Sequence, residues 1–276
     1  MRDIILFGDC LDTLKQFDEK PRCCITSPPY YGLRDYGGED NQIGQEESPE
    51  EYIQNLVKVF REVRNLLAED GTLWLNIGDS YYNYRPGKGQ ALVKQTVSNT
   101  KQDLPDKCAR RGNKLEGYKE KDLIGIPWML AFALRADGWY LRQDIIWHKP
   151  NPMPESVRDR CTKSHEYLFL LSKNQNYYFD VDAIKEPTRR KRSVWKITNK
   201  PYRGSHFAVF PPDLIKPCIL AGSEENDIIL DPFMGSGTTA FVAKELGRDY
   251  IGCELHEDYG KLIQKRLHER KVKIVQ

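Results

Sequence analysis

The chain has 276 residues, of which 39% are hydrophobic and 30% are charged, and its formal net charge is +2. This composition describes a polar globular protein, and no apolar run approaches the roughly 20 residues that a membrane helix needs. The seven cysteines are scattered without a CxxC pair, so we expect neither a metal site nor a disulfide framework. The opening MRDIILFGD lacks the pattern of a signal peptide, and we expect a cytoplasmic protein.

The first half of the chain alternates short apolar runs with helical patterns. Residues 3–8 (DIILFG) and 23–26 (CCIT) predict strands with a short helix between them, and residues 71–80 (GTLWLNIGDS) predict a third strand. A long helix precedes this third strand, with Ser48 as its N-cap and Glu51 at the capping-box position. Its apolar residues recur with the period of a helix that buries one face.

The second half continues the alternation, beginning with a helix that starts near Pro127. The remaining predicted elements are strands at 139–147 and 165–172, a helix at 211–223, a buried strand at 227–232, a helix at 238–247, a strand at 249–255 and a closing amphipathic helix at 256–273. Strands separated by helices predict an α/β fold in three layers, with a mostly parallel sheet, in a single domain over residues 1–276.

Two segments interrupt the alternation and concentrate positive charge. Residues 81–120 are polar, without periodicity and longer than an ordinary connection, and residues 85–121 carry ten bases against four acids. The second segment is residues 185–204, and eight bases stand against one acid within residues 185–203. Such segments on a nearly neutral body either bind a polyanion or are solvated loops, and charge alone does not separate the two.

The stretch DIILDPFMGSGTT, residues 227–239, has the layout of a ligand-binding turn. A buried strand ends in Asp231, a turn with Gly235 and Gly237 follows, and a helix begins next. Glycine lets the backbone approach a ligand closely, and a helix N-terminus offers free N–H donors. Glu254 ends the next strand about twenty residues on, where an acid can bind both hydroxyls of a ribose. The lysine of a triphosphate-binding loop is missing, so we expect an adenosine-bearing cofactor, with a bare packing turn as the alternative.

The stretch TSPPY, residues 26–30, ends a buried strand with two consecutive prolines. Each proline removes a backbone donor and fixes φ, and Ser27 before Pro28 is driven toward an extended conformation. The result is a rigid lip of hydroxyl and carbonyl acceptors beside the flat ring of Tyr30. Such a lip suits the exocyclic amine of a base, and a stiff exit from a strand is the alternative interpretation.

Together the two stretches resemble the amino-methyltransferases of DNA, which use S-adenosylmethionine to methylate N4 of cytosine or N6 of adenine. The Ser-Pro-Pro-Tyr form is most similar to the N4-cytosine members. The order, with the catalytic motif at Ser27 and the cofactor turn at Asp231, resembles the circularly permuted β group. The resemblance covers most of the chain apart from residues 81–120, and it implies a Rossmann-like class I methyltransferase fold.

The resemblance also implies which residues carry the chemistry. Ser27 and the Pro28 carbonyl would accept hydrogen bonds from the target amine, and Tyr30 would stack on a base extruded from the duplex. The implied catalytic residues are Ser27, Pro28, Pro29 and Tyr30, and the implied cofactor-binding residues are Asp9, Cys10, His206, Asp231, Pro232, Phe233, Gly235, Gly237, Thr238 and Glu254. No metal or general base is needed, because the sulfonium is an activated donor and the methylated amine loses its proton to solvent.

The same resemblance makes DNA the expected partner of the basic segments. The expected contacts are Arg110 and Arg111 in the 81–120 insertion, and Arg189, Arg190, Lys191 and Arg192 in residues 185–204, a candidate target-recognition segment. Trp195 is expected to be packed, and His148 and His165 are expected to be structural. A restriction endonuclease is the expected functional partner, and we expect a monomer or a homodimer.

Several other functions stay open on the sequence alone. Ser27 suits either amine, so N6-adenine methylation is the first alternative to N4-cytosine methylation. A DNA-binding module with an inactive methyltransferase fold is the second, although Tyr30, Asp231 and Glu254 are all present. Methylation of RNA or of a protein glutamine would use a similar lip, but it would not need the basic insertion. A nicotinamide-dependent oxidoreductase has no use for the Pro-Pro-Tyr lip.

Overall fold

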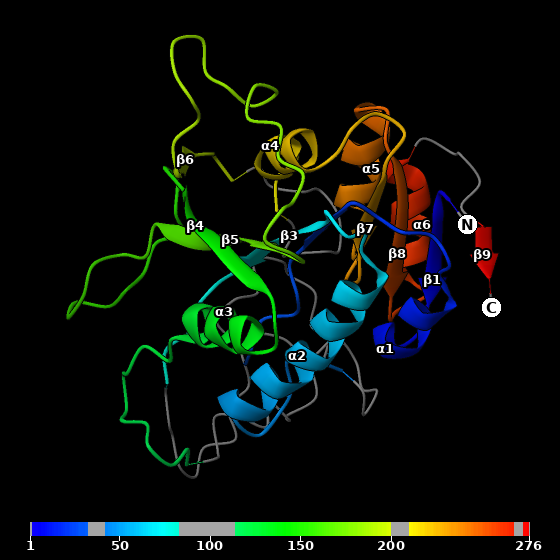
Figure 1. Ribbon diagram of the computed structural model, residues 1–276. Helices are drawn as coiled ribbons and strands as arrows, with labels where there is room; N and C mark the ends of the chain where they lie inside the picture. The colour runs from blue at the N-terminus through cyan, green and yellow to red at the C-terminus, as the bar shows by residue number, and fades with distance from the viewer. Residues whose placement is uncertain (1, 33–41, 83–113, 200–209, 268–272, 276) are drawn as a thin grey trace.

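A single mixed sheet forms the centre of the structure, a computed structural model that describes residues 2–32, 42–82, 114–199, 210–267 and 273–275. Its strands are β1 (Ile4–Phe7), β2 (Cys23–Thr26), β3 (Thr72–Ile77), β4 (Tyr140–His148), β5 (His165–Ser172), β6 (Val194–Lys196), β7 (Ile228–Asp231), β8 (Asp249–Glu254) and β9 (Lys273–Val275). Their spatial order is β6-β4-β5-β3-β2-β7-β8-β1-β9 (Figure 1). Among the described strands, only β5 runs antiparallel to its neighbours, β3 and β4. The predicted mostly parallel sheet is therefore confirmed.

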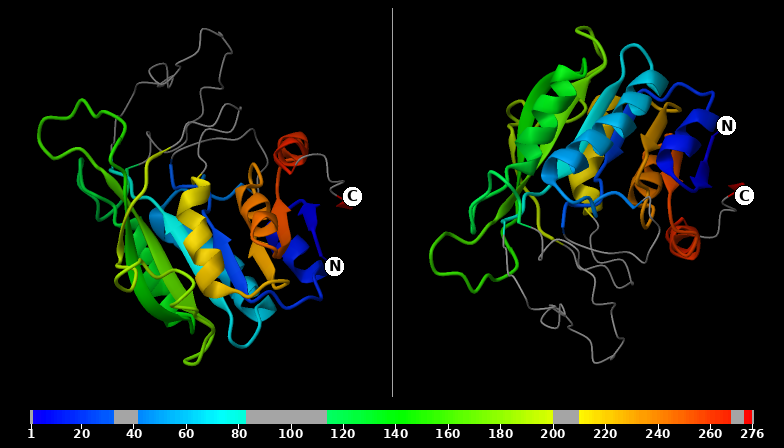
Figure 2. Two further views of the ribbon diagram at one scale, coloured as in Figure 1. Left: turned by 90° about the horizontal axis from the view of Figure 1, so that it is seen from above. Right: turned by 90° about the horizontal axis from the view of Figure 1, so that it is seen from below.

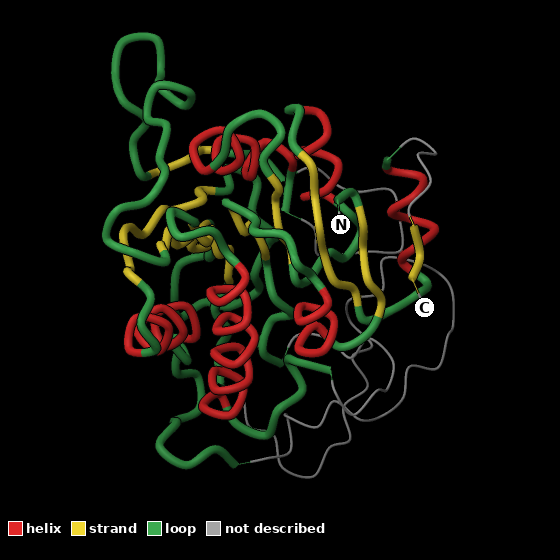
Figure 3. Tube along the Cα trace, turned by 45° about the vertical axis from the view of Figure 1, so that its right-hand side comes forward, coloured by secondary structure: helices red, strands yellow, loops and turns green. Residues whose placement is uncertain are grey.

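Helices cover both faces of this sheet. The helices are α1 (Cys10–Thr13), the short 3₁₀ helix η1 (Leu14–Gln16), α2 (Pro49–Leu66), α3 (Ile126–Ala136), α4 (Pro212–Gly222), α5 (Thr238–Glu245) and α6 (Tyr259–Arg266). Side chains of α1, α2 and α3 pack on one face, and those of α4, α5 and α6 pack on the other (Figure 2). Figure 3 shows the strands in yellow between the two groups of red helices. The three predicted layers are present.

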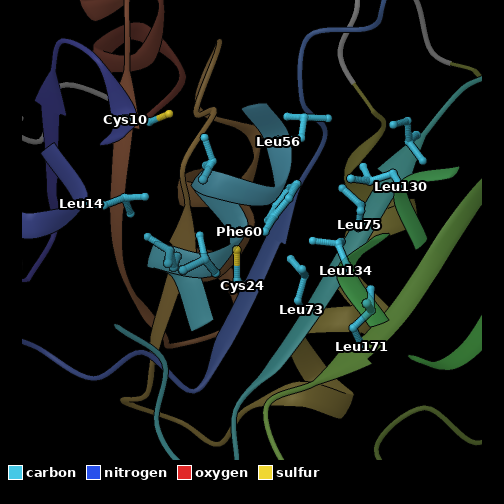
Figure 4. Packing of buried hydrophobic residues seen from close by; sticks show 14 of the residues in the cluster. Cys10, Leu14, Cys24, Leu56, Phe60, Leu73, Leu75, Leu130, Leu134 and Leu171 are labelled. Carbon is cyan, nitrogen blue, oxygen red and sulfur yellow. The ribbon is translucent and has the colours of Figure 1, made fainter. Parts of the chain in front are cut away.

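Helix α2 illustrates how local sequence sets an element. The Ser48 hydroxyl accepts a hydrogen bond from the Glu51 backbone N–H at 3.1 Å, and the Glu51 carboxylate accepts one from the Glu47 N–H at 3.2 Å. These bonds satisfy backbone donors that a helix start otherwise leaves open. The apolar stripe is fully buried, as at Leu56 and Phe60. Figure 4 shows these two side chains facing the strands.

Alternation along the central strands divides the core into two clusters. In β2, Cys24 joins the cluster under α2 and α3, whereas Cys23 and Ile25 join the cluster under α4 and α5. Successive residues of a strand point to opposite faces, so a strand covered on both sides is apolar throughout. The buried thiols behave as small hydrophobic groups, since burial raises the pKa of Cys23 to about 12. Cys108 lies outside the described residues.

The C-terminal region differs from its prediction. The closing helix was expected over residues 256–273, but α6 ends at Arg266 and residues Lys273–Val275 form β9, parallel to β1. The pairing of this segment with β1 outweighs a helical period carried mostly by charged residues. Residues 268–272 lie outside the described residues. Among the described helices, none is both long and apolar enough to cross a bilayer.

Candidate active site

The carboxyl ends of four adjacent parallel strands lie at one edge of the sheet. The strands β2, β7, β8 and β1 are consecutive neighbours and all run in the same direction. Ser27 follows β2, Asp231 and Glu254 end β7 and β8, and Asp9 follows β1. Ligands of open α/β sheets bind at this edge. The sheet thus gathers, from distant parts of the chain, residues that the sequence assigned separately to the lip and to the cofactor.

The turn between β7 and α5 is held from inside by Asp231. Its carboxylate accepts hydrogen bonds from the Thr26 hydroxyl at 2.6 Å, the Thr239 hydroxyl at 2.7 Å and the Phe233 N–H at 3.0 Å. The side chain is 1% exposed, and burial raises its pKa to about 6. The carboxylate of Asp231, a predicted cofactor contact, thus joins β2 to the glycine turn.

The two glycines of this turn adopt a conformation that other residues rarely reach. Gly235 and Gly237 have φ values of 54° and 78°. A Cβ at Gly237 would also lie 3.1 Å from Cγ2 of Ile263 in α6, so space is restricted there. Gly237 is the N-cap of α5, and Thr238 is its first residue. Arg266 of α6 donates to the Thr238 hydroxyl and, at 2.8 Å, to the Ser236 hydroxyl, which fixes the outer side of the turn.

Glu254 connects the glycine turn to the end of β8. Its Oε2 accepts a hydrogen bond from the Gly235 N–H at 2.8 Å, and its Oε1 accepts one from the His256 N–H at 3.0 Å. Burial raises the pKa of this carboxyl to about 7. Backbone N–H groups thus hold this carboxylate in place at the carboxyl end of β8.

The β1 end adds a short capped helix to this edge. Gly8 has a φ of 129° and donates its N–H to the Glu254 backbone carbonyl at 2.9 Å. Asp9 caps α1 by accepting from the Leu11 N–H at 2.8 Å, and it remains half-buried. Cys10 is buried, and burial raises the pKa of its thiol to about 12. Cys10 therefore offers this edge its backbone rather than a reactive sulfur.

The lip after β2 is rigid for the reasons the prolines suggest, with added support from α2. Pro28 is buried, while Ser27, Pro29 and Tyr30 are half-buried. The Pro29 carbonyl accepts a hydrogen bond from the Tyr52 hydroxyl at 2.9 Å, so it is already committed to α2. The Ser27 oxygen lies 3.5 Å from the Tyr30 hydroxyl.

Tyr30 lies across the end of β3 and reaches β5. A Cβ added at Gly78 would be 2.7 Å from Cε2 of Tyr30, so glycine leaves room for the ring. The phenol donates to Oε2 of Glu166 at 2.8 Å. Burial and the nearby Glu166 charge raise the pKa of Tyr30 well above its ordinary value, so the phenol stays protonated. Sequence reasoning did not predict this partner.

The sequence that forms this site matches a known family. The family model for N6/N4 methyltransferases, described as DNA methylase, matches residues 22–265. The chain belongs to the N6/N4 DNA methylase family. It is 49% identical to the Type II methyltransferase M.SmaI of Serratia marcescens, over 97% of this chain and 91% of that protein. It is 46% identical to M.Cfr9I of Citrobacter freundii, over 97% of this chain and 88% of that protein. This methylase is therefore a Type II DNA methyltransferase.

Solved structures give the same fold. The PvuII DNA methyltransferase, described as cytosine-N4-specific, has a TM-score of 0.70 at 19% identity and covers 97% of this methylase and 87% of its own chain. A methylase from Thermus thermophilus, solved with S-adenosylmethionine, has a TM-score of 0.66 at 24% identity. The match covers 96% of this methylase and 92% of the Thermus chain. The expected class I fold is confirmed. In the chain, β2, which precedes the lip, comes before β7, which precedes the glycine turn.

The basic segments of this methylase are described only in part. Arg110, Arg111 and His206 lie outside the described residues. Arg190 and Arg192 are exposed, Arg189 is paired with Glu186, and Lys191 lies over the Trp195 ring at 4.8 Å. Trp195 is 5% exposed and donates to the Arg192 carbonyl at 2.7 Å, so it is packed as expected.

The 81–120 insertion leaves and returns at the site edge. The Tyr82 N–H donates to the Asp122 carbonyl at 2.8 Å, and the Lys121 N–H donates to the Tyr82 carbonyl at 2.9 Å. These bonds close the base of the insertion just beyond the carboxyl end of β3. The segment between them thus starts beside the strand end over which Tyr30 lies.

Two histidines expected to be structural face each other at the same edge. His148 and His165 are directly paired at the ends of β4 and β5. Burial lowers the pKa of His165, and the charge of Lys163 lowers it further, so the ring is neutral near pH 7. The His165 ring meets Tyr167 edge-on at 5.5 Å. Both histidines sit at the ends of the paired strands, beside residues that sequence reasoning overlooked.

Those overlooked residues are Glu166, Lys149 and Asn76. They come from β5, the end of β4 and β3, and they meet beside Tyr30. Antiparallel pairing of β4 with β5 is what brings Lys149 next to Glu166. The sequence does contain a signal for this ion pair, because Glu166 lies at the start of one predicted strand and Lys149 follows the end of the preceding one. It becomes informative only once those strands are known to pair.

Proposed function

We propose that this DNA methyltransferase transfers the methyl group of S-adenosylmethionine to the N4 amine of cytosine, in a base extruded from the duplex. The observation that carries the proposal is the junction at Asp231, whose carboxylate binds both Thr26, next to the lip, and the glycine turn. That junction holds an acceptor lip and a cofactor turn side by side on neighbouring strands. Transfer between two bound groups requires this kind of fixed approach.

The residues of the cofactor half fit an adenosine-bearing molecule. Glu254 lies at the end of β8, where its carboxylate is placed to accept from ribose hydroxyls, and Asp9 lies on the adjacent strand end for the adenine. Phe233 is half-buried beside the turn, and its ring meets that of Phe60 at an interplanar angle of 72°. Family membership and two structures solved with S-adenosylmethionine support this cofactor. When bound, S-adenosylmethionine supplies a methyl group on a positively charged sulfur.

The residues of the lip act on the amine. The Ser27 hydroxyl and the Pro28 carbonyl accept hydrogen bonds from its two N–H groups, which turns the nitrogen lone pair out of conjugation with the ring. The ring of Tyr30 stacks on the extruded base. As the nitrogen gains positive charge its N–H groups become stronger donors, so the same acceptors bind the transition state more tightly than the ground state.

The proposal of cytosine rather than adenine as the target rests on similarity to known methyltransferases. The Ser-Pro-Pro-Tyr form resembles the N4-cytosine members, and the PvuII enzyme with this fold is described as cytosine-N4-specific. N6 of adenine is the alternative target, because a hydroxyl acceptor suits both amines. A restriction endonuclease of matching specificity is the proposed functional partner, as expected for a Type II methylase acting in the cytoplasm.

Nucleoside analysis tests the proposed function. The protein is incubated with methyl-labelled S-adenosylmethionine and DNA of mixed sequence, and the DNA is digested to nucleosides. Label in N4-methyldeoxycytidine is the expected result, and Tyr30→Ala is the control that should remove it. Label in N6-methyldeoxyadenosine would show that the methylated base is adenine and not cytosine. If no nucleoside carries label although the cofactor is bound, the result would favour the alternative function, a DNA-binding module without methyltransferase activity.

The pH dependence of cofactor affinity tests the role of Glu254. Its pKa is raised to about 7, and only the ionised carboxylate accepts two hydroxyls with both oxygens. Affinity for S-adenosylmethionine should therefore increase about tenfold between about pH 6 and pH 8, as the ionised fraction rises. Calorimetry measures this, and Glu254→Gln should bind weakly with little pH dependence. A wild-type affinity that does not change with pH would contradict the assignment.

The stability of the free protein should change with pH in the direction opposite to the cofactor affinity. Because the folded pKa of Glu254 lies above the ordinary value of 4.5, its contribution to the free energy of unfolding is largest below that value. It is lost as the pH rises through about 7. Cofactor binding and stability of the free protein should thus change in opposite directions over the same pH range. A thermal unfolding series, run with and without S-adenosylmethionine, separates the two effects.

Two exposed arginines test the DNA contact proposed for the 185–204 segment. Arg190 and Arg192 are exposed, so Arg190→Gln with Arg192→Gln removes charge without opening the core. DNA affinity should fall, and the slope of log affinity against log salt should decrease by about 2, one for each lost phosphate contact. Fluorescence anisotropy at several salt concentrations measures this. Lys58→Gln on exposed α2 surface is the control, and an unchanged slope in the double variant would exclude the contact.

A further inference from the structure

A polar cluster links the lip to a neighbouring part of the sheet that the proposed mechanism does not use. We name it the Glu166 cluster and define it as Asn76, Lys149 and Glu166 together with the Tyr30 hydroxyl. Lys149 and Glu166 form an ion pair, with side chains 15% and 17% exposed. Removing charges this far from water is costly unless they are paired, and here each has its partner.

The ion pair and two further hydrogen bonds occupy both oxygens of Glu166. Oε1 of Glu166 accepts from Lys149, whose ammonium also lies 4.1 Å from the centroid of the Trp147 ring. Oε2 of Glu166 accepts from Tyr30 at 2.8 Å and from the Asn76 amide at 3.3 Å. Both oxygens of Glu166 are thus engaged by donors, and a carboxylate paired with an ammonium only accepts hydrogen bonds.

The direction of the hydrogen bond at Tyr30 follows. The phenol has one proton, and two acceptors lie near its oxygen: Oε2 of Glu166 at 2.8 Å and Oδ1 of Asn76 at 3.3 Å. The shorter bond to the charged group takes the proton. The lone pairs of the phenol oxygen are then its only remaining means of bonding to Ser27, whose oxygen is 3.5 Å away.

The direction of the hydrogen bonds at Tyr30 determines whether the Ser27 hydroxyl faces a substrate as a donor or as an acceptor. When the phenol oxygen can only accept, the Ser27 hydroxyl must point its proton toward Tyr30. Both lone pairs of Ser27 then face away from that proton and are open to N–H donors. A hydroxyl is both donor and acceptor and rotates to suit its neighbours. Without a fixed neighbour, its proton could instead be directed at the amine, whose N–H groups it would repel.

We propose that Glu166 is a positioning residue that acts through Tyr30, holding the Ser27 hydroxyl as an acceptor and the Tyr30 ring in its stacking plane. The proposal rests on the proposed function, in which Ser27 binds an amine and Tyr30 stacks on a base. Lys149 keeps Glu166 in place, and Gly78 leaves the ring its room. Glu166 itself touches neither base nor cofactor in this scheme.

Two single variants and their combination test the proposal. Glu166→Gln replaces the carboxylate by a group that also donates, and Tyr30→Phe keeps the ring while removing the hydroxyl. Each should lower kcat about 10- to 100-fold, the cost of a misdirected group at a reacting centre, with little change in KM for DNA or in S-adenosylmethionine affinity. The double variant should lose no more than either single one, because both break the same chain.

A carboxylate outside the Glu166 cluster supplies the control variant. Glu155→Gln removes a similarly buried carboxylate, paired with Arg160 in the β4–β5 loop, and should leave kcat near wild type. Losses that multiply in the double variant, or a fully active Tyr30→Phe, would overturn the proposal. If Glu166→Gln does not fold, as judged by its S-adenosylmethionine binding, Tyr30→Phe still decides. A wild-type protein that methylates no amine in DNA would refute the proposed function instead.

A fluorescent base provides a second readout. With 2-aminopurine at the target position, extrusion raises fluorescence, and stacking on Tyr30 lowers it again. Glu166→Gln should give brighter bound DNA than wild type, since the ring is no longer held in its plane, whereas Glu155→Gln should match wild type. Equal fluorescence in wild type and Glu166→Gln would contradict control of the stacking plane.

Discussion

Replacing Ser27 by alanine is expected to lower kcat about 100- to 1,000-fold while leaving S-adenosylmethionine affinity unchanged. The lost hydroxyl is the acceptor that gains strength as the amine nitrogen becomes positive, and losing one such group costs this much in other enzymes. Ser27 lies after β2, on the lip side of the Thr26–Asp231 hydrogen bond. The cofactor turn on the far side of that bond should stay intact.

Single-turnover methylation and calorimetry with S-adenosylmethionine measure the two quantities. Ser80→Ala is a matched control, since Ser80 is a half-buried serine beyond the carboxyl end of the adjacent strand β3. It should change neither quantity appreciably. A Ser27→Ala variant that loses turnover and cofactor affinity in equal measure would assign Ser27 a structural role.

Replacing Asp231 by alanine is expected to lower the free energy of unfolding by about 3 kcal/mol or more. The change leaves the Thr26 hydroxyl, the Thr239 hydroxyl and the Phe233 N–H without their acceptor in a fully buried place. Each buried group that loses its partner costs about 1–3 kcal/mol. Urea denaturation measures the loss, which should exceed that of Asp180→Ala, whose carboxylate accepts two backbone amides near the surface.

Asp231→Asn distinguishes the charge from the hydrogen bonds. The raised pKa of Asp231, about 6 against an ordinary 3.8, means that its stabilising contribution is present at low pH. It is lost as the pH rises through about 6. Asparagine carries no charge, so the variant should have a flatter stability profile between about pH 4 and pH 7. A profile parallel to wild type would show that another group titrates there.

Local sequence was enough for the elements whose boundaries depend on near neighbours. The capping residues Ser48 and Glu51 predicted the start of α2, and Gly235 and Gly237 predicted the turn before α5. The contacts that the sequence did not predict depend on which strands pair. Glu166 reaches Tyr30 only because β5 runs antiparallel beside β3.

The use of Asp231 also required the structure. A carboxylate at the end of a buried strand can face outward to a ligand or inward to neighbouring hydroxyls, and the sequence around Asp231 is compatible with both. The partner that decides is Thr26, some two hundred residues earlier in the chain and directed at Asp231 from β2. Its role depends on the adjacency of β2 and β7, which local patterns do not determine.

The same adjacency determines how closely the two halves of the proposed site approach each other. Strands β2 and β7 are hydrogen-bonded neighbours, so the two halves of the site leave the sheet only about 4.8 Å apart. That spacing belongs to the backbone and does not change when surface side chains are substituted. The 81–120 insertion enters and leaves beyond β3, outside this pair of strands. Substitutions in that insertion should therefore leave the spacing of β2 and β7 unchanged.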